Sequence, residues 1–277
     1  FDISKLIYNR VPKCGSTTLI TLLENLSKLN HFKHYNSKIY NKRLLNFKQQ
    51  KIFINELMQY SAPFSYDRHI YFINFELYNV SNIPIYINII REPVERVISS
   101  YYYRRFVALK SMTNNLTDKS KPSDYWFNKS FEKCVFNKDS ECDINANNSF
   151  IMSLLPYFCG QHRKCLDVNS KWALEAAKHN IEKHYKVVGI LEYFNVTLKV
   201  LQHIIPQFFE GVLNSYYNND NNKIHKNKNI QKQQISHQIK SYLKANLSND
   251  YELYEFAVQR LFKQYKYILQ ESNRTLF

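Results

Sequence analysis

Residues 7–18 read IYNRVPKCGSTT, and this stretch decides the fold because it predicts a strand that enters a helix through an anion-binding loop. Residues 7–11 have the apolar character of a strand, and residues 17–29 carry leucines at helical spacing. The Gly-Ser-Thr-Thr sequence at 15–18 places free backbone N–H groups and hydroxyls at the start of the helix, where the helix dipole favours an anion. Lys13 adds a full positive charge to this loop.

The loop differs from the phosphate loop of ATP and GTP hydrolases. That loop requires a glycine directly before its lysine and a serine or threonine directly after it. Here Pro12 precedes Lys13 and Cys14 follows it, so a nucleotide hydrolase is a poor match. Taken alone, the segment could also be an ordinary turn in which Ser16 caps the helix.

Composition indicates one globular domain with an acidic partner. The 277 residues suffice for a sizeable core, and an apolar fraction of 44% with 22 Tyr and 19 Phe excludes a disordered chain. Thirty-eight Lys and Arg against 23 Asp and Glu give a formal charge of +15. Nucleic acid, an anionic membrane surface and a sulfated or carboxylated polysaccharide all satisfy that charge, which alone does not choose among them.

The longest apolar run, residues 83–90, is far shorter than the roughly 18 residues that a membrane span requires, and it reads as a buried strand. The sequence opens on Phe1 rather than Met and enters the strand, loop and helix at once. We therefore expect an N-terminal part to precede it in the full-length protein.

The cysteines leave two interpretations open. They stand at Cys14, Cys134, Cys142, Cys159 and Cys165. The last four allow three pairings, of which the two between near neighbours close the shortest loops. His162 lies between Cys159 and Cys165, so a zinc site is the alternative, although no two-residue cysteine spacing supports it. Disulfides would indicate an oxidising compartment, and several Asn-x-Ser/Thr sequons agree with a secretory route.

A second motif, INIIREPVERVISSYYY at residues 87–103, strengthens the first. A buried strand ends on Arg91, and Pro93 starts a helix on which Ser99 lies two turns along. Arg91 and Ser99 can therefore present a guanidinium and a hydroxyl to one phosphate. The alternative is that Arg91 pairs with Glu95 or caps the sheet edge. Both motifs end strands at the side where parallel sheets bind ligands, which favours a phosphate site.

The remaining pattern alternates strands with helices. We expect strands at 68–75, 83–90 and 186–191, and helices at 52–60, 93–106, 170–184, 195–217 and 233–270, with Ser170 as a cap and an interruption at Pro206. Residues 111–148 form a long polar excursion, and residues 218–232 a mobile loop. The alternation predicts an α/β fold with a mostly parallel central sheet flanked by helices.

With both motifs in place, the chain resembles the glycosaminoglycan uronyl 2-O-sulfotransferase family. The resemblance extends over nearly the whole chain, through YNRV at 8–11, PIYIN at 84–88, residues 91–106, PYFCG at 156–160, KWALE at 171–175 and VG at 188–189. Residues 13–16, 68–69 and 159–162 are more similar to the dermatan/chondroitin branch. The heparan branch has His-Gly-His where this chain reads Asp67-Arg68-His69.

The resemblance implies one sulfotransferase catalytic domain over residues 1–277, with a P-loop-like phosphosulfate loop. It also implies the pairings Cys134–Cys142 and Cys159–Cys165, which match the family's two disulfides. The implied reaction moves sulfate from 3'-phosphoadenosine 5'-phosphosulfate (PAPS) to the 2-hydroxyl of a uronic acid in a glycosaminoglycan, with dermatan or chondroitin favoured. A heparan sulfate acceptor and a non-catalytic glycosaminoglycan-binding protein are the alternatives.

The resemblance also implies the site residues. His69 is the expected general base, because a neutral imidazole can accept a hydroxyl proton near neutral pH, and Lys13 would stabilise charge on the leaving oxygen. The expected cofactor-binding residues are Lys13, Cys14, Gly15, Ser16, Thr17, Thr18, Arg91 and Ser99. The expected acceptor-binding residues are Arg10, Arg68, Arg104 and Arg105. For the last two, a solvated basic helix end is an equal alternative.

The expected partner is an anionic glycosaminoglycan, with no metal ion. Paired cysteines and sequons argue against nucleic acid. Family members are type II single-pass proteins of the Golgi lumen, so we expect a membrane anchor in the full-length protein, and the resemblance also allows a homo-oligomer. Lys226 and Lys228 lie where sulfotransferases close over the cofactor, although a plain charged loop explains them equally. The sequence does not distinguish iduronate from glucuronate.

Overall fold

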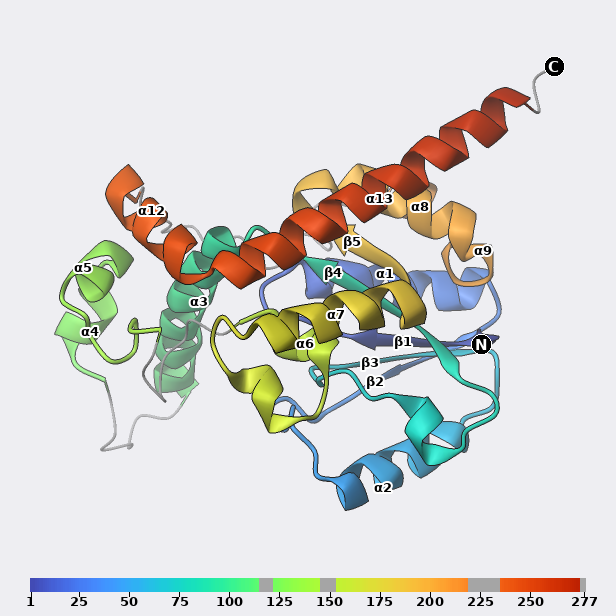
Figure 1. The fold of residues 1–277 in the computed structure, drawn as a ribbon, viewed down its shortest axis with the longest axis horizontal. Coiled ribbons are helices and arrows are strands. Elements are labelled where there is room, and N and C mark those ends of the chain that lie inside the picture. Colours follow the sequence, from blue (N-terminus) through green and yellow to red (C-terminus); the bar gives the residue numbers. More distant parts are fainter. Residues whose placement is uncertain (115–121, 145–152, 219–234, 275–277) are drawn as a thin grey trace.

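A five-stranded parallel sheet forms the centre of the computed structural model, which describes residues 1–114, 122–144, 153–218 and 235–274 (Figure 1). The strands are β1 (Asp2–Asn9), β2 (Lys33–Asn36), β3 (Phe64–Arg68), β4 (Pro84–Ile90) and β5 (Tyr185–Ile190). Their order across the sheet is β2-β3-β1-β4-β5, and all four pairings are parallel. The predicted α/β fold with a mostly parallel sheet is therefore confirmed.

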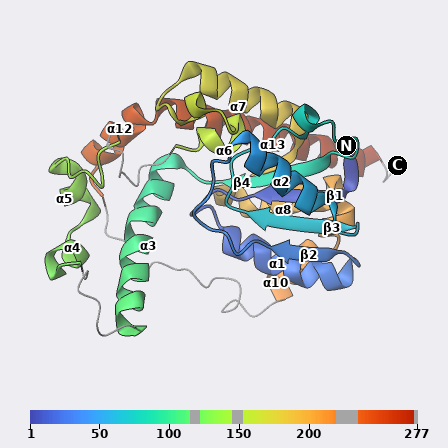
Figure 2. The same ribbon diagram turned by 90° about the horizontal axis from the view of Figure 1, so that it is seen from below.

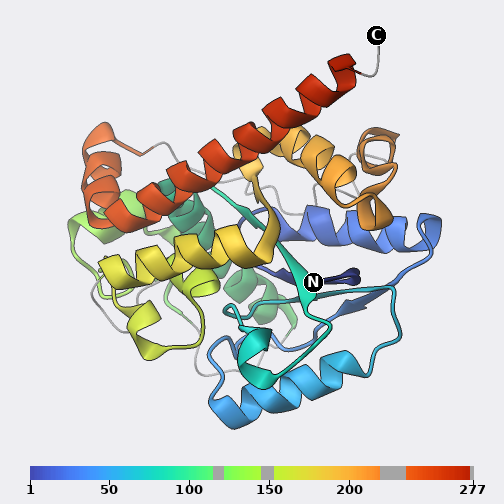
Figure 3. The same ribbon diagram turned by 45° about the vertical axis from the view of Figure 1, so that its right-hand side comes forward.

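Helices cover both faces of this sheet. They are α1 (Ser16–Leu29), α2 (Phe47–Met58), α3 (Pro93–Asn114), α4 (Asp124–Asn128), α5 (Phe131–Phe136), α6 (Leu155–Cys159), α7 (Lys171–His184), α8 (Phe194–Ile204), α9 (Pro206–Phe209), α10 (Val212–Asn218), α12 (His237–Asn246) and α13 (Ser248–Arg274). Figure 2 shows α1 and α10 on one side of the sheet and α7 on the other. Helix α13 runs beside α7 and β5 and extends past the body of the domain (Figure 3).

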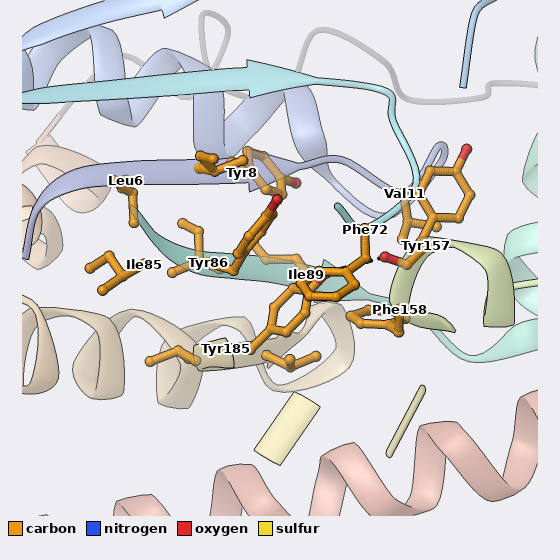
Figure 4. Packing of buried hydrophobic residues seen from close by; sticks show 14 of the residues in the cluster. Leu6, Tyr8, Val11, Phe72, Ile85, Tyr86, Ile89, Tyr157, Phe158 and Tyr185 are labelled. Carbon is orange, nitrogen blue, oxygen red and sulfur yellow. Dashed lines mark hydrogen bonds between the residues drawn. The ribbon is translucent and has the colours of Figure 1, made fainter. Parts of the chain in front are cut away.

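The main core lies on both faces of the central strands. β4 is buried at all seven positions, as expected for a strand covered on both sides. Aromatic rings fill the space beside it, with Tyr86 and Tyr185 at 5.2 Å between centroids and Phe72 at 5.2 Å from Tyr86 (Figure 4).

Polar side chains lock the ends of the central strands together inside this core. The Asn88 amide donates to the carbonyl of Asn9 at 2.7 Å, and the Asn9 amide donates to the carbonyl of Tyr157 at 2.7 Å. The Tyr185 hydroxyl donates to the Asn9 side-chain oxygen at 3.0 Å. Buried polar groups satisfied in this way fix strand positions, so the residues that follow β1, β4 and β5 start from fixed points.

A second, smaller apolar cluster lies where α3, α5 and α12 meet, beyond the carboxyl ends of the strands (Figures 1 and 2). Its members include Val97, Tyr101, Phe131 and Leu243. The Cys134–Cys142 disulfide closes the loop after α5 inside this cluster, and Cys159–Cys165 joins α6 to the short 3-10 helix at Arg163–Leu166. Both expected disulfides are present, and Cys14 is a buried free thiol.

The strand expected at 68–75 is wrong. β3 ends at Arg68, where the expectation began, and residues 70–73 form a buried loop instead. Phe72 in that loop packs on Tyr86 and Tyr185, so burial of a loop produced the apolar pattern. The expectation also missed β2, whose sequence Lys-His-Tyr-Asn is polar because it is the edge strand beside β3.

The helix expected at 233–270 is wrong as a single element, because the described residues form α12 and α13 with a break at Leu247. The other expected helices are confirmed with shifted ends. α2 begins earlier than expected because Asn46 and Gln49 form a capping box, and α3 runs eight residues beyond the expected end at 106. Ser170 caps α7 as expected, accepting from the backbone of Ala173 at 3.2 Å. The polar excursion contains α4 and α5 in its described part. The expected loop at 218–232, with Lys226 and Lys228, lies outside the described residues except for its first residue, the end of α10.

Candidate functional site

The carboxyl ends of β1, β3 and β4 meet at the edge of the sheet that faces α3 (Figure 2). Asn9 lies beside Arg68 in the register, and the Arg10 backbone N–H donates to the Arg68 carbonyl at 2.9 Å. The chain segments that follow β1 and β3 are therefore adjacent. Parallel sheets bind ligands at this edge, which places the two sequence motifs at a candidate site.

Residues 10–15 form the Lys13 loop, which connects β1 to α1. Lys13 and Gly15 both adopt left-handed backbone angles, with φ of 66° and 77°. The left-handed angle at position 15 favours glycine, and a Cβ there would also displace the Leu191 side chain, whose methyl carbon would lie 2.6 Å away. Gly15 is the N-cap of α1 and no side chain caps the helix, so the alternative turn capped by Ser16 is not adopted.

Two positive charges meet at this loop. The Arg91 guanidinium follows β4 and lies close enough to repel the Lys13 ammonium. Burial and this repulsion lower the pKa of Lys13 to about 8. The Cys14 thiol donates to the carbonyl of Pro12 at 3.6 Å, and burial raises the pKa of that thiol to about 12. Cys14 is therefore a neutral packing residue at physiological pH.

Carboxylates surround Arg91 without enclosing it. Its Nη2 lies 3.5 Å from Glu95, and its Nε lies 4.0 Å from Glu192. The Arg91–Glu95 pairing that the sequence offered as an alternative is therefore present, but at long distance and with a half-exposed carboxylate. Weak, partly solvated pairs of this kind contribute little to stability, so Arg91 can exchange them for a bound anion.

One face of α3 looks toward the Lys13 loop. Arg96, Ser99 and Tyr103 share this face because they follow one another at spacings of three and four. Arg96 is 2% exposed and close enough to lower the pKa of Cys14, which opposes the effect of burial. Ser99 is 8% exposed. The Tyr103 ring contacts Lys13, whose Nζ lies 3.5 Å from the ring centroid.

His69 lies on the other side of the Lys13 loop. Its Nδ1 is 2.9 Å from the carbonyl oxygen of Arg10. A carbonyl only accepts, so Nδ1 carries the proton and Nε2 keeps its lone pair. Burial, followed by the charges of Arg10 and Arg43, lowers the pKa of His69 to about 4. His69 is therefore a neutral imidazole at physiological pH, able to accept a proton at Nε2.

The arginines next to His69 are mostly buried. Arg10 is 4% exposed, and its Nε lies 2.8 Å from a carboxylate oxygen of Asp67. The other Asp67 oxygen is 3.2 Å from His34. Arg68 is 5% exposed and donates to the carbonyl of Lys42 at 3.0 Å. These residues fix the segments around His69 and expose little of their own surface.

Arg104 and Arg105 differ although they are neighbours on α3. Arg104 is exposed. Arg105 is 5% exposed, with Nη2 at 2.8 Å from Glu141 and its guanidinium between the rings of Tyr101 and Trp126, at 3.5 and 4.2 Å. The Arg105 Nε also donates to the carbonyl of Trp126 at 3.0 Å, so the second cluster holds this side chain through an ion pair, a hydrogen bond and two rings.

Sequence reasoning missed several residues around the site. They are Arg43, Arg96, Tyr103 and Glu192. Arg96 and Tyr103 could have been found from Ser99, because they occupy the same helical face. Arg43 and Glu192 reach the site through the folded backbone, and no local spacing marks them.

The described residues include no group of three or more His, Cys, Asp or Glu placed to hold a metal ion. Cys159 and Cys165 are joined in a disulfide, so they do not provide the thiolates that a zinc site with His162 would require. Within the described ranges, no helix has the length and apolar character needed to cross a membrane.

A sequence model described as the Sulfotransferase family matches residues 2–257, which include every element described at the site. The chain belongs to the sulfotransferase family. This sulfotransferase is also similar to curated proteins with related names. The human protein named Uronyl 2-sulfotransferase is 32% identical over 260 residues, covering 93% of this chain and 62% of the human protein.

Two proteins of Drosophila melanogaster are similar to this sulfotransferase. The Uronyl 2-sulfotransferase homolog pip is 34% identical over 276 residues, covering 95% of this chain and 53% of that protein. The Heparin sulfate O-sulfotransferase is 31% identical over 282 residues, covering 97% of this chain and 75% of that protein. The chain thus spans between 53% and 62% of the human and Drosophila relatives named for uronyl sulfation.

Proposed function

We propose that this sulfotransferase moves sulfate from PAPS to the 2-hydroxyl of a uronic acid in a glycosaminoglycan, with dermatan or chondroitin as the favoured acceptor. One observation carries the proposal. His69 is held neutral, with Nδ1 on the Arg10 carbonyl and Nε2 able to accept a proton, and it contacts the loop whose Lys13 lies near Arg91. The names of the similar human and Drosophila proteins support the substrate class.

The Lys13 loop fits the phosphosulfate end of PAPS. The loop ends at the N-terminus of α1, where unpaired backbone N–H groups and the helix dipole favour a phosphate, and Lys13 and Gly15 adopt the left-handed angles found in anion-binding loops. The residues we propose to hold PAPS are Lys13, Cys14, Gly15, Ser16, Thr17, Thr18, Arg91 and Ser99. Cys14 would contribute only its backbone, because its side chain is 0% exposed.

PAPS supplies a sulfuryl group whose bond to a phosphate oxygen breaks as the acceptor oxygen attacks in line. In this scheme His69 Nε2 takes the proton of the 2-hydroxyl while the sugar oxygen bonds to sulfur. The Lys13 ammonium and the loop N–H groups stabilise the negative charge that collects on the phosphate oxygen. Every role falls to a side chain or amide at one edge of the sheet.

Acceptor binding is divided among the arginines by their surroundings. Arg104 is exposed, so its guanidinium can donate to a carboxylate or sulfate. Arg10 is buried, and its Nη2 would meet an acceptor only after neighbouring side chains move. Arg68 adjoins His69 and completes the proposed contacts. Arg105 is the weakest of the four candidates because Glu141 already pairs with it.

The remaining parts of the proposal concern the whole protein. We propose one catalytic domain over residues 1–277, an anionic glycosaminoglycan as partner, and a Golgi-lumen location with a membrane anchor in the full-length protein. The disulfides support an oxidising compartment. A homo-oligomer remains a proposal of the same kind.

Radiolabelled PAPS offered with desulfated dermatan, chondroitin and heparan tests the function. We expect label on the 2-oxygen of uronic acid in dermatan or chondroitin. Label only in heparan would move the chain to the heparan alternative. Binding of the polymers without any label would support the non-catalytic alternative and contradict the proposed reaction.

A further inference from the structure

Lys13 rests on an aromatic ring from a different element. Its ammonium nitrogen lies 3.5 Å from the ring centroid of Tyr103, which is half-buried on α3. Tyr103 follows Ser99 by four residues, so both lie on the face of α3 that looks toward the Lys13 loop. A cation this close to the face of an aromatic ring is attracted by the ring quadrupole.

No carboxylate of the described residues stabilises the charge of Lys13. In the described part of the chain, no Asp or Glu forms an ion pair with Lys13, and Arg91 from the end of β4 repels it. Glu95 on α3 and Glu192 after β5 approach Arg91 instead. The Cys14 thiol stays neutral. Among the described residues, the Tyr103 ring is therefore the contact that favours a charged Lys13.

We propose that Tyr103 is a positioning residue for Lys13, and that the face of its ring fixes the position of the ammonium beside α3. Its consequence for catalysis rests on the proposed function, in which Lys13 stabilises the leaving phosphate oxygen. The contact itself exists in the ligand-free protein and is measurable there. Only the ring face is required, so phenylalanine should replace tyrosine and leucine should not.

The ring acts on the protonation of Lys13 in a known direction. Burial and Arg91 already lower the pKa of Lys13 to about 8, and a ring face favours the ammonium over the amine. Tyr103→Leu should therefore lower the pKa of Lys13 further, by about 0.5 to 1 pH unit for a contact of this type. Tyr103→Phe should leave the pKa within error of the parent.

The first test is an NMR titration of the ligand-free protein whose lysines carry ¹³C-methyl groups, with the Lys13 signal assigned through Lys13→Arg. Tyr125→Leu is the matched control, because Lys129 lies 5.8 Å from the Tyr125 ring far from the loop. The control should not move the Lys13 signal.

A Lys13 pKa unchanged by Tyr103→Leu would overturn the proposal. If leucine prevents folding, Tyr103→Met provides a second variant for the same titration.

The second test is the pH dependence of transfer. With Tyr103→Leu, kcat should fall about two- to tenfold, more at pH 8 than at pH 6.5, while KM for the acceptor stays near the parent value. Equal losses for Tyr103→Phe and Tyr103→Leu would mean that the hydroxyl matters, which contradicts the proposal. If the parent protein transfers no sulfate, the proposed function fails while the titration still decides the role of Tyr103.

Discussion

Arg91, just before α3, and Arg105, within that helix, have opposite surroundings. At the start, Arg91 is 21% exposed in its side chain and meets carboxylates only at 3.5 and 4.0 Å. Further along, Arg105 is 6% exposed, pairs with Glu141 at 2.8 Å and lies between two aromatic rings. A loosely paired arginine can exchange its partner for a ligand anion at little cost, whereas a buried and closely paired one supports the fold. One helix therefore joins a binding region to a structural region.

The largest expected effect tests whether the chemistry lies at the binding region. His69→Ala should lower kcat by about 100- to 10,000-fold, because a positioned base contributes this much to the chemical step. Affinity for PAPS should stay near the parent value, because the base adds little to cofactor binding. Steady-state kinetics with a calorimetric titration of 3',5'-ADP measure both quantities.

Two variants serve as comparisons for His69. Lys13→Ala should harm both kcat and cofactor affinity, since Lys13 would touch the cofactor before and during transfer. His162→Ala should retain activity, because His162 is exposed and its Nδ1 accepts from the Lys164 backbone at 3.1 Å. If folded His69→Ala protein keeps nearly the parent rate, His69 is not the base, and His162 is the next candidate.

The next effect concerns Arg105 in the structural region of α3. Arg105→Ala should lower the free energy of unfolding by about 3 kcal/mol, because it leaves the largely buried Glu141 without this partner and removes the packing against Trp126. Urea unfolding measures the change. Cofactor affinity of the folded variant should match that of the parent, and a specific loss of acceptor binding with normal stability would instead return Arg105 to the acceptor site.

Arg91→Ala should show the reverse pattern. We expect 3',5'-ADP to bind about 2 to 3 kcal/mol more weakly, the scale of lost charge-assisted hydrogen bonds to a phosphate. Stability should change by less than about 1 kcal/mol, because the pairs with Glu95 and Glu192 are long and partly solvated. Unchanged calorimetric affinity would mean that Arg91 is structural, and the contrast with Arg105 would disappear.

The smallest effect concerns acid stability. Burial lowers the pKa of His184 to about 4 from an ordinary 6.5. Between pH 6.5 and about pH 4, His184 is protonated in the unfolded chain but neutral in the folded protein. The free energy of unfolding therefore falls as the pH is lowered through this range. His184→Phe should keep the packing on Phe72 and raise Tm at pH 5 relative to the parent by roughly 2 to 4 °C. The Tm difference should vanish at pH 7.5.

The fold was predictable where pattern and burial agree. β1 with α1 and β4 with α3 follow from apolar runs bounded by helix starts, and Ser170 marks α7. β2 and β3 were not predictable in this way. β2 is a polar edge strand, and β3 buries Asp67 because Arg10 from another segment pairs with the carboxylate and His34 lies 3.2 Å from it. Such pairing is invisible to periodicity.

The candidate site was predictable where a residue lies within a motif. Lys13, His69, Arg91 and Ser99 follow from the resemblance, and the structure places the first and third together. Their surroundings were not predictable, because the partners arrive from distant segments. Glu192 reaches Arg91 from the end of β5, and the fixed tautomer of His69 depends on a carbonyl of the Lys13 loop.

The position of β5 in the sequence determines when the site is completed during folding. β4 and β5 are neighbours in the sheet, yet residues 91–184 separate them, including both disulfides, which close loops spanning only 8 and 6 residues. Short loops close readily, whereas pairing between strands far apart in the sequence is slow. β5 is also the last strand to be synthesised, so it joins a sheet whose other strands left the ribosome earlier. Its arrival brings Leu191 against Gly15 and Glu192 toward Arg91. A newly made chain therefore acquires a finished anion site only when this strand docks.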